Sequence, residues 1–161
     1  MRKLKIYLDT SIISAYYDYS KPVRQLITEK WFKNDSCDFD LFISVMTIQE
    51  IEELQNYEKK EKIKQLILIY KINILEINEP SKVLANEYIS HGAIPKSEPE
   101  DALHIAIASM NKIEALASWN FKHIVSLNPI RKIHEINKNN ELINIEIGSL
   151  ELFGGAKYGN I

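Results

Sequence analysis

Short apolar segments alternate along the chain with amphipathic ones, and this alternation predicts the order of strands and helices. Runs rich in Ile, Leu and aromatic residues are typical of strands. We expect such strands at residues 3–8, 41–44, 72–77, 115–118 and 142–147, with residues 124–126 also extended. Apolar residues spaced three and four positions apart predict helices instead. These helices are expected at residues 10–17, 22–32, 45–56, 58–70, 80–90, 98–111 and 129–137.

Strands that alternate with helices in this way predict an α/β fold with a mainly parallel sheet and helices on both faces. Residues 1–150 hold all the predicted elements and are expected to form a single domain. Residues 151–161, which include three glycines, are expected to be a flexible tail. In such sheets, binding sites form at the carboxyl ends of the strands. Asp9 and residues 118–120 both follow predicted strand ends, so a site is expected there.

The composition is that of an ordinary globular domain, with 45% hydrophobic and 26% charged residues in a chain of 161. A net charge of −2 argues against a protein that holds nucleic acid by bulk charge alone. The single cysteine, Cys37, excludes an internal disulfide and fits a reducing cytoplasm. Residues 1–8 are too short for a signal peptide, and no apolar run approaches the roughly 20 residues that span a bilayer. We therefore expect a cytoplasmic protein without a membrane segment.

Asp101 lies in a predicted helix that is otherwise apolar enough to be packed inside the protein. Burying an ionised carboxylate is costly unless a cation or hydrogen-bond donors accompany it. Ser97 and Glu100 fit a capping box at the start of this helix, which gives Glu100 a structural task and leaves Asp101 without one. A functional role for Asp101 is therefore favoured. His104, one turn further along, is expected to be an ordinary core or edge histidine.

Two more acids lie in comparably apolar settings, and each allows two interpretations. Asp9 ends the first predicted strand, where it suits either a helix N-cap, the commoner role, or a metal ligand held at a strand end. Glu50 either completes a capping box with Thr47 or, if the helix starts at Ser44, lies in its second turn between apolar neighbours. The sequence leaves the alternatives for both acids open.

Asn120 follows the fourth predicted strand, within the segment SWNFKHI. Its side-chain oxygen can bind a divalent ion directly or through water, although asparagine also suits a strand-to-turn corner. Phe121 is expected in the core. Trp119 and His123 could belong to the core or could stack on a nucleic-acid base.

The chain lacks the motifs of several other chemistries. It has no GxxxxGK[ST] phosphate loop, no GxGxxG run and no GxSxG nucleophile turn. The segment LDTS lacks the second Asp of a phosphatase that forms a phosphoaspartate, and no Cys or His spacing resembles a zinc site. What remains is a carboxylate-rich site at a sheet edge. Its hard oxygen ligands prefer Mg²⁺ or Mn²⁺, which activate water for attack on phosphate substrates.

Four segments, in order along the chain, resemble those of PIN-domain proteins and are most similar to the VapC-type ribonucleases of bacterial toxin–antitoxin pairs. They are YLDTSIIS, ISVMTIQEI, PEDALHIAIA and ASWNFKHI. The resemblance implies a three-layer α/β/α fold around a five-stranded sheet ordered 3-2-1-4-5. It also implies an acidic pocket that binds Mg²⁺ or Mn²⁺, and endonucleolytic cleavage of RNA by the protein. The metal-binding and catalytic residues implied by this match are Asp9, Glu50, Asp101 and Asn120.

The resemblance also sets expectations about partners. It implies a homodimer that acts on RNA and, if the protein is a toxin, a small antitoxin whose tail enters the acidic groove. A free-standing RNA-processing enzyme would have no such partner. His123 departs from the family pattern, because several members carry a further Asp there. One acid fewer is then left for a second ion, and this motivates the alternative hypothesis of a non-catalytic PIN fold that binds RNA or a protein.

Overall fold

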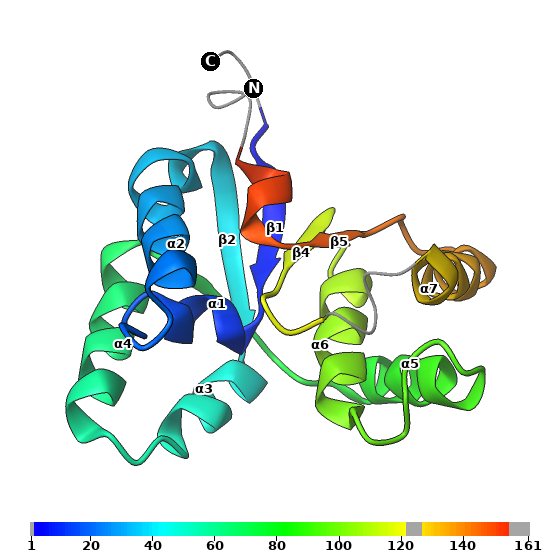
Figure 1. Ribbon diagram of the computed structural model, residues 1–161. Helices are drawn as coiled ribbons and strands as arrows, with labels where there is room; N and C mark the ends of the chain where they lie inside the picture. The colour runs from blue at the N-terminus through cyan, green and yellow to red at the C-terminus, as the bar shows by residue number, and fades with distance from the viewer. Residues whose placement is uncertain (1, 122–126, 155–161) are drawn as a thin grey trace.

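The computed structural model describes residues 2–121 and 127–154, and these residues form a five-stranded sheet whose strands are all parallel. The strand order is β3-β2-β1-β4-β5 (Figure 1). The strands are β1 (Leu4–Leu8), β2 (Phe39–Ser44), β3 (Asn73–Leu75), β4 (Ala115–Ala117) and β5 (Glu146–Gly148). The expected α/β fold with sheet order 3-2-1-4-5 is confirmed.

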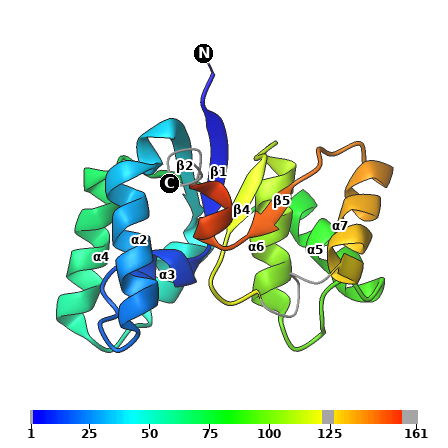
Figure 2. The same ribbon diagram turned by 45° about the horizontal axis from the view of Figure 1, so that its top comes forward.

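Helices cover both faces of the sheet and produce the three expected layers. One group, α1 to α4, lies on one side, and the other group, α5 to α7, lies on the opposite side (Figures 1 and 2). The helices are α1 (Thr10–Ala15), α2 (Pro22–Asn34), α3 (Val45–Glu52), α4 (Tyr57–Ile69), α5 (Glu79–Ser90), α6 (Pro99–Met110) and α7 (Leu127–Asn139), with 3-10 helices η1 (Ser36–Asp38) and η2 (Leu150–Phe153).

The central strand β1 divides the interior into two hydrophobic cores. Successive side chains of a strand point to opposite faces of the sheet. Accordingly, Ile6 and Leu8 pack in the core with α1, α2 and α4, whereas Tyr7 packs in the core with α5, α6 and α7. All three side chains are fully buried. A strand buried on both faces is what a parallel sheet between two helical layers requires, and it fixes the position of Asp9 directly after β1.

The last strand is shorter than the sequence predicts. A strand was expected over residues 142–147, but only Glu146–Gly148 pair with β4. The residues before it are held by helix α7 instead: the Asn137 amide donates to the carbonyl of Ile143 (3.3 Å), and His134 Nε2 bonds to the carbonyl of Ile145 (2.8 Å). The extended segment expected at residues 124–126 lies outside the described residues.

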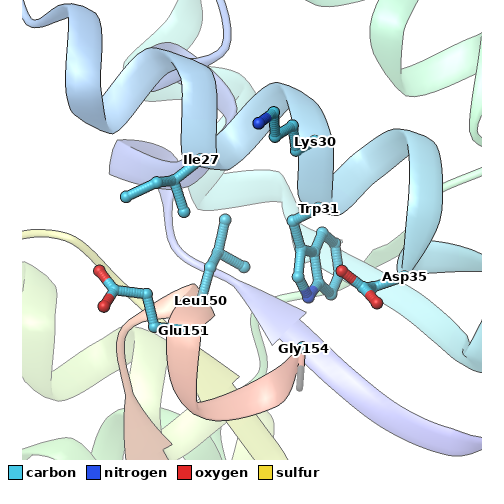
Figure 3. A pocket seen from close by; sticks show the side chains of 7 residues that line it. All are labelled: Ile27, Lys30, Trp31, Asp35, Leu150, Glu151 and Gly154. Atoms are coloured by element: carbon cyan, nitrogen blue, oxygen red, sulfur yellow. The ribbon is translucent and has the colours of Figure 1, made fainter. Parts of the chain in front are cut away.

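A cavity of about 360 Å³ separates α2 from the 3-10 helix η2 (Figure 3). Trp31 Nε1 donates to the Phe153 carbonyl (3.4 Å), which ties η2 to α2. The division into a domain of residues 1–150 and a tail of residues 151–161 stays a prediction, because residues 155–161 lie outside the described part of the chain. The cavity is lined by Ile27, Lys30, Trp31, Asp35, Leu150, Glu151 and Gly154.

No helix within residues 2–121 and 127–154 combines the length and apolar character needed to cross a membrane.

Candidate active site

The four side chains selected from the sequence line one cleft of about 240 Å³ at the carboxyl edge of the sheet. Asp9 directly follows β1, Asn120 lies just beyond β4, Glu50 is on α3 and Asp101 is in the first turn of α6. Because β1 and β4 are neighbours in the sheet, the residues that follow them meet at the same edge. The complete lining is Asp9, Thr10, Ser11, Ser14, Glu50, Glu100, Asp101, His104 and Asn120.

Asp9 is buried and held by three hydrogen bonds to one of its two oxygens. Its Oδ2 accepts from the Ser11 backbone N–H (3.2 Å), the Ser11 hydroxyl (2.6 Å) and the Ser118 hydroxyl (2.9 Å). The first of these bonds makes Asp9 the N-cap of α1, so the capping interpretation is confirmed. The cap occupies Oδ2 and leaves Oδ1 on the His104 side, 3.5 Å from the imidazole Nε2. Asp9 can therefore cap helix α1 through Oδ2 and still take part in the site through Oδ1.

The turn that carries Asn120 is tied to Asp9 through two serines. Ser118 Oγ, which donates to Asp9, also accepts from the Asn120 backbone N–H (3.0 Å). Ser11 Oγ accepts from the Trp119 backbone N–H (2.9 Å). Asn120 itself is exposed at the mouth of the cleft. The sequence placed Ser118 at this edge but gave neither serine a role, because a small polar residue shows no sign of a partner that is distant along the chain.

The residues around Asn120 divide between core and surface. Phe121 is buried in the core, as expected. Trp119 is half-buried against α2: its Nε1 donates to Thr28 Oγ1 (3.0 Å), and the Arg24 guanidinium lies 5.4 Å from its ring centre. Its ring is therefore already engaged within the protein. His123 lies outside the described residues.

Glu50 lies in the second turn of α3, so one of its two interpretations is removed. The helix begins after Ser44, whose backbone N–H donates to Thr47 Oγ1 (3.4 Å). Ser44 is thus the N-cap and Thr47 completes the capping box from the third helical position, so Glu50 is not needed for one. Glu50 is half-buried, and its Oε1 accepts a hydrogen bond of 2.8 Å from His104 Nε2.

His104 is buried as a core histidine would be, but it also belongs to the cleft, which the sequence did not predict. Its Nε2 faces Glu50 and Asp9, and its Nδ1 lies 2.6 Å from the Tyr7 hydroxyl. Burial acts to lower the pKa of His104, but the hydrogen bond with Glu50 and the Asp9 carboxylate outweigh it, so the pKa is raised. One signal was available: His104 is three positions after Asp101 and therefore on the same helix face.

Asp101 lies at the start of α6, and its surroundings favour the neutral carboxyl group. Burial raises its pKa to about 7, the carboxylates of Asp9 and Glu98 add to the rise, and His104 opposes it. The capping box predicted from Ser97 and Glu100 is wrong. The helix starts after Glu98 with Pro99 as its first residue and no side-chain cap, because proline suits the first helical position. Glu100 is exposed and lines the cleft instead.

The donor chemistry of the cleft fits a hard divalent cation. Four carboxylates and one side-chain amide line it, and His104 is the one basic side chain in the lining given above. Burial is the main cause of the raised pKa of Asp101, and the nearby carboxylates of Asp9, Glu98 and Glu100 add to it. Within the part of the chain that the structure describes, however, no three His, Cys, Asp or Glu side chains gather closely enough to share one ion. Direct coordination by Asp9, Glu50 and Asp101 therefore requires side-chain rotations in the cleft.

Several proteins of known structure share this fold at low sequence identity. One is VapC20 from Mycobacterium tuberculosis, a Sarcin-Ricin loop cleaving toxin: TM-score 0.59, 10% identity, covering 88% of this chain and 99% of that one. Another is VapBC2 from Rickettsia felis bound to a DNA fragment from its promoter, with a TM-score of 0.54 and 13% identity. The match covers 89% of this chain and 97% of that one. A third is FitAB bound to an IR36 DNA fragment, with a TM-score of 0.55 and 20% identity. The match covers 88% of this chain and 92% of that one. A comparison with curated proteins finds no match.

The sequence also matches a protein family directly. The PIN domain family matches residues 6–120, which is more than half of the chain. The matched region runs from β1 to the turn after β4 and thus includes Asp9, Glu50, Asp101 and Asn120. The chain therefore belongs to the PIN domain family.

Proposed function

We propose that the protein is a metal-dependent endoribonuclease that cleaves RNA phosphodiester bonds. The observation that carries this proposal is the convergence of Asp9, Glu50, Asp101 and Asn120 on one cleft from four separate elements. The three acids would hold Mg²⁺ or Mn²⁺, and the Asn120 amide oxygen would bind the ion directly or through water. When bound, such an ion activates water and neutralises charge on the scissile phosphate.

The protein's own residues would supply positioning and a proton acceptor. Ser11 and Ser118 fix the Asp9 carboxylate through Oδ2. One of the cleft carboxylates would accept the proton that the attacking water gives up.

RNA is the substrate that the comparisons support. The fold and the family are those of a PIN domain, and the neighbour from M. tuberculosis is a toxin that cleaves the Sarcin-Ricin loop. We extend the proposal to a toxin role in a type II toxin–antitoxin pair, with a small antitoxin partner and a homodimeric assembly. A short reading frame next to the gene, co-purification of its product, and the mass in solution measured by light scattering test these three points.

The decisive experiment compares wild type with Asp101→Asn in an RNA cleavage assay with Mn²⁺ and with EDTA. We expect cleavage by wild type with Mn²⁺ only, and a loss on the order of 100-fold in the variant because one proposed metal ligand is removed. Glu53→Gln is the matched control, since Glu53 is exposed and does not line the cleft. If purified Asp101→Asn cleaves RNA as fast as wild type, the site assignment is wrong.

One observation favours the alternative function, a non-catalytic PIN fold that binds RNA or a protein. His104 lies between the two acids: its Nε2 already hydrogen-bonds Glu50 (2.8 Å) and is 3.5 Å from the Asp9 carboxylate. Tight Mn²⁺ binding without cleavage of varied RNAs would favour this alternative over the nuclease.

A further inference from the structure

A chain of three hydrogen bonds links the buried centre of the sheet to the cleft. The Tyr7 hydroxyl donates to Ser44 Oγ (2.8 Å) and lies 2.6 Å from His104 Nδ1. On the other side of the imidazole ring, Nε2 donates to Glu50 Oε1 (2.8 Å). Ser44, Tyr7 and His104 are each no more than 1% exposed. The chain thus joins β1, the end of β2 and α6 to the glutamate on α3.

In two acids of the cleft, Asp9 and Glu50, one carboxylate oxygen is held by hydrogen bonds from the protein. Asp9 has one oxygen, Oδ2, engaged by the serines at residues 11 and 118, and Glu50 has one oxygen, Oε1, engaged by His104. Glu50 needs such a restraint more than Asp9 does. Its side chain is longer and is 32% exposed, against 8% for Asp9, so without His104 it would sample several rotamers.

A purely structural role does not account for this histidine. A buried core position on an apolar helix would be filled at lower cost by leucine or phenylalanine, because a buried polar ring must find partners for both nitrogens. Here one partner is the hydroxyl of Tyr7, itself anchored on Ser44, and the other is a cleft carboxylate. The two bonds orient the ring toward the cleft rather than toward a backbone carbonyl.

We infer that His104 is a positioning residue for the proposed metal site, which holds Glu50 through Nε2 while Tyr7 and Ser44 hold the imidazole through Nδ1. This inference rests on the proposed function. Side chains that hydrogen-bond a metal ligand fix its orientation, and their loss lowers metal affinity by about 10- to 100-fold. What Glu50 requires is an N–H donor at this position, so a glutamine amide is the conservative replacement.

The test measures the Mn²⁺ dissociation constant by titration calorimetry for wild type, His104→Leu, His104→Gln and Tyr7→Phe. We expect His104→Leu to weaken Mn²⁺ binding by about 10- to 100-fold. His104→Gln should recover most of that loss, because its amide can donate to Glu50. Tyr7→Phe should fall between wild type and His104→Leu, since it removes only the hydroxyl that orients the ring. His91→Leu, at an exposed histidine after α5, is the control and should bind Mn²⁺ like wild type.

The outcomes separate this inference from the function on which it rests. If wild type neither binds Mn²⁺ nor cleaves RNA, the proposed function fails and the inference falls with it. If wild type binds Mn²⁺ and His104→Leu binds it equally well or more tightly, the positioning role alone is wrong. Should His104→Leu not fold, Tyr7→Phe decides, because it preserves volume: unchanged Mn²⁺ affinity in that variant overturns the inference.

Discussion

The hydroxyl of Ser118 donates to the carboxylate of Asp9 across 2.9 Å, although the two residues are 109 positions apart in the chain. The contact joins the residues that follow two neighbouring strands, β1 and β4. Ser118 Oγ also accepts from the backbone N–H of Asn120. One hydroxyl therefore orients an acid and the turn that carries the amide.

Replacing Ser118 by alanine is expected to weaken both stability and the proposed cleavage. The change leaves the Asn120 N–H without its acceptor and removes one donor to Asp9, at a cost of about 1–2 kcal/mol in the free energy of unfolding. The RNA cleavage rate should fall by about 10-fold or more because the turn is no longer fixed. Urea unfolding and single-turnover cleavage measure the two effects. Ser20→Ala, at an exposed serine, is the control, and equal behaviour of the two variants would contradict the prediction.

The metal-free protein is expected to lose stability as the pH rises through neutrality. The pKa of Asp101 is raised to about 7, so the folded state binds this proton more tightly than the unfolded state does. The stabilisation is complete below the ordinary carboxyl pKa and is lost as pH rises through 7. The raised pKa of His104 acts in the same direction.

Thermal unfolding in EDTA between about pH 5.5 and about pH 8 tests this dependence. The melting temperature of wild type should fall over this range, and that of Asp101→Asn should fall less, because an asparagine has no proton to lose. Saturating Mn²⁺ should raise the wild-type melting temperature most at the upper end, where the proton no longer competes for Asp101. A slope that is the same in both proteins would show that Asp101 is not the titrating group.

A buried polar cluster far from the cleft offers a stability prediction that should leave catalysis intact. The Tyr88 hydroxyl bonds to Ser109 Oγ (3.3 Å) and to Asn137 Oδ1, which joins α5, α6 and α7. Tyr88→Phe leaves the two buried acceptors without this donor and should lower the free energy of unfolding by about 1–2 kcal/mol. For a domain of this size the melting temperature falls by about 2–4 °C per kcal/mol. The cleavage rate of the folded fraction should not change.

Asp35 is expected to destabilise the protein. Its carboxylate is 4% exposed beside the cavity between α2 and η2, and Oδ2 has no hydrogen-bond partner in the described part of the chain. A buried acceptor oxygen without a donor costs free energy, so Asp35→Asn should raise the free energy of unfolding by about 1 kcal/mol. Asp38→Asn, at an exposed acid on η1, is the control. Destabilisation by Asp35→Asn in urea unfolding would show that the carboxylate has a partner among the remaining residues.

The elements and the acids of the cleft were predictable because they depend on local patterns. A strand ending at Leu8 places Asp9 at its carboxyl end, and the apolar row around Asp101 marks a buried helix face. Parallel sheets bring such residues to one edge, so the convergence followed from the order of strands. The positions of Glu50 and Thr47 on α3 stayed open because they depend on where a helix begins, and that choice is made by tertiary contacts.

The interactions that arrange the cleft were not predictable in the same way. Ser118 and His104 act through partners that are distant in the sequence, and these pairings depend on strand register and helix packing. The capping box assigned to Glu100 failed because Pro99 shifted the start of α6 by one position. Excluding Glu100 as a cap nevertheless drew attention to Asp101, which does line the cleft, although Glu100 lines it as well.

The position of β1 between β2 and β4 has a consequence for the newly synthesised chain. Asp9 leaves the ribosome well before its partner Ser118, which follows 109 positions later, and before the neighbouring Asn120. Helix α6, which carries Asp101 and His104, also comes late. Until the fourth strand joins the first, the cleft does not exist. A growing chain that has not yet produced α6 and the turn after β4 therefore carries Asp9 without the residues that complete the cleft.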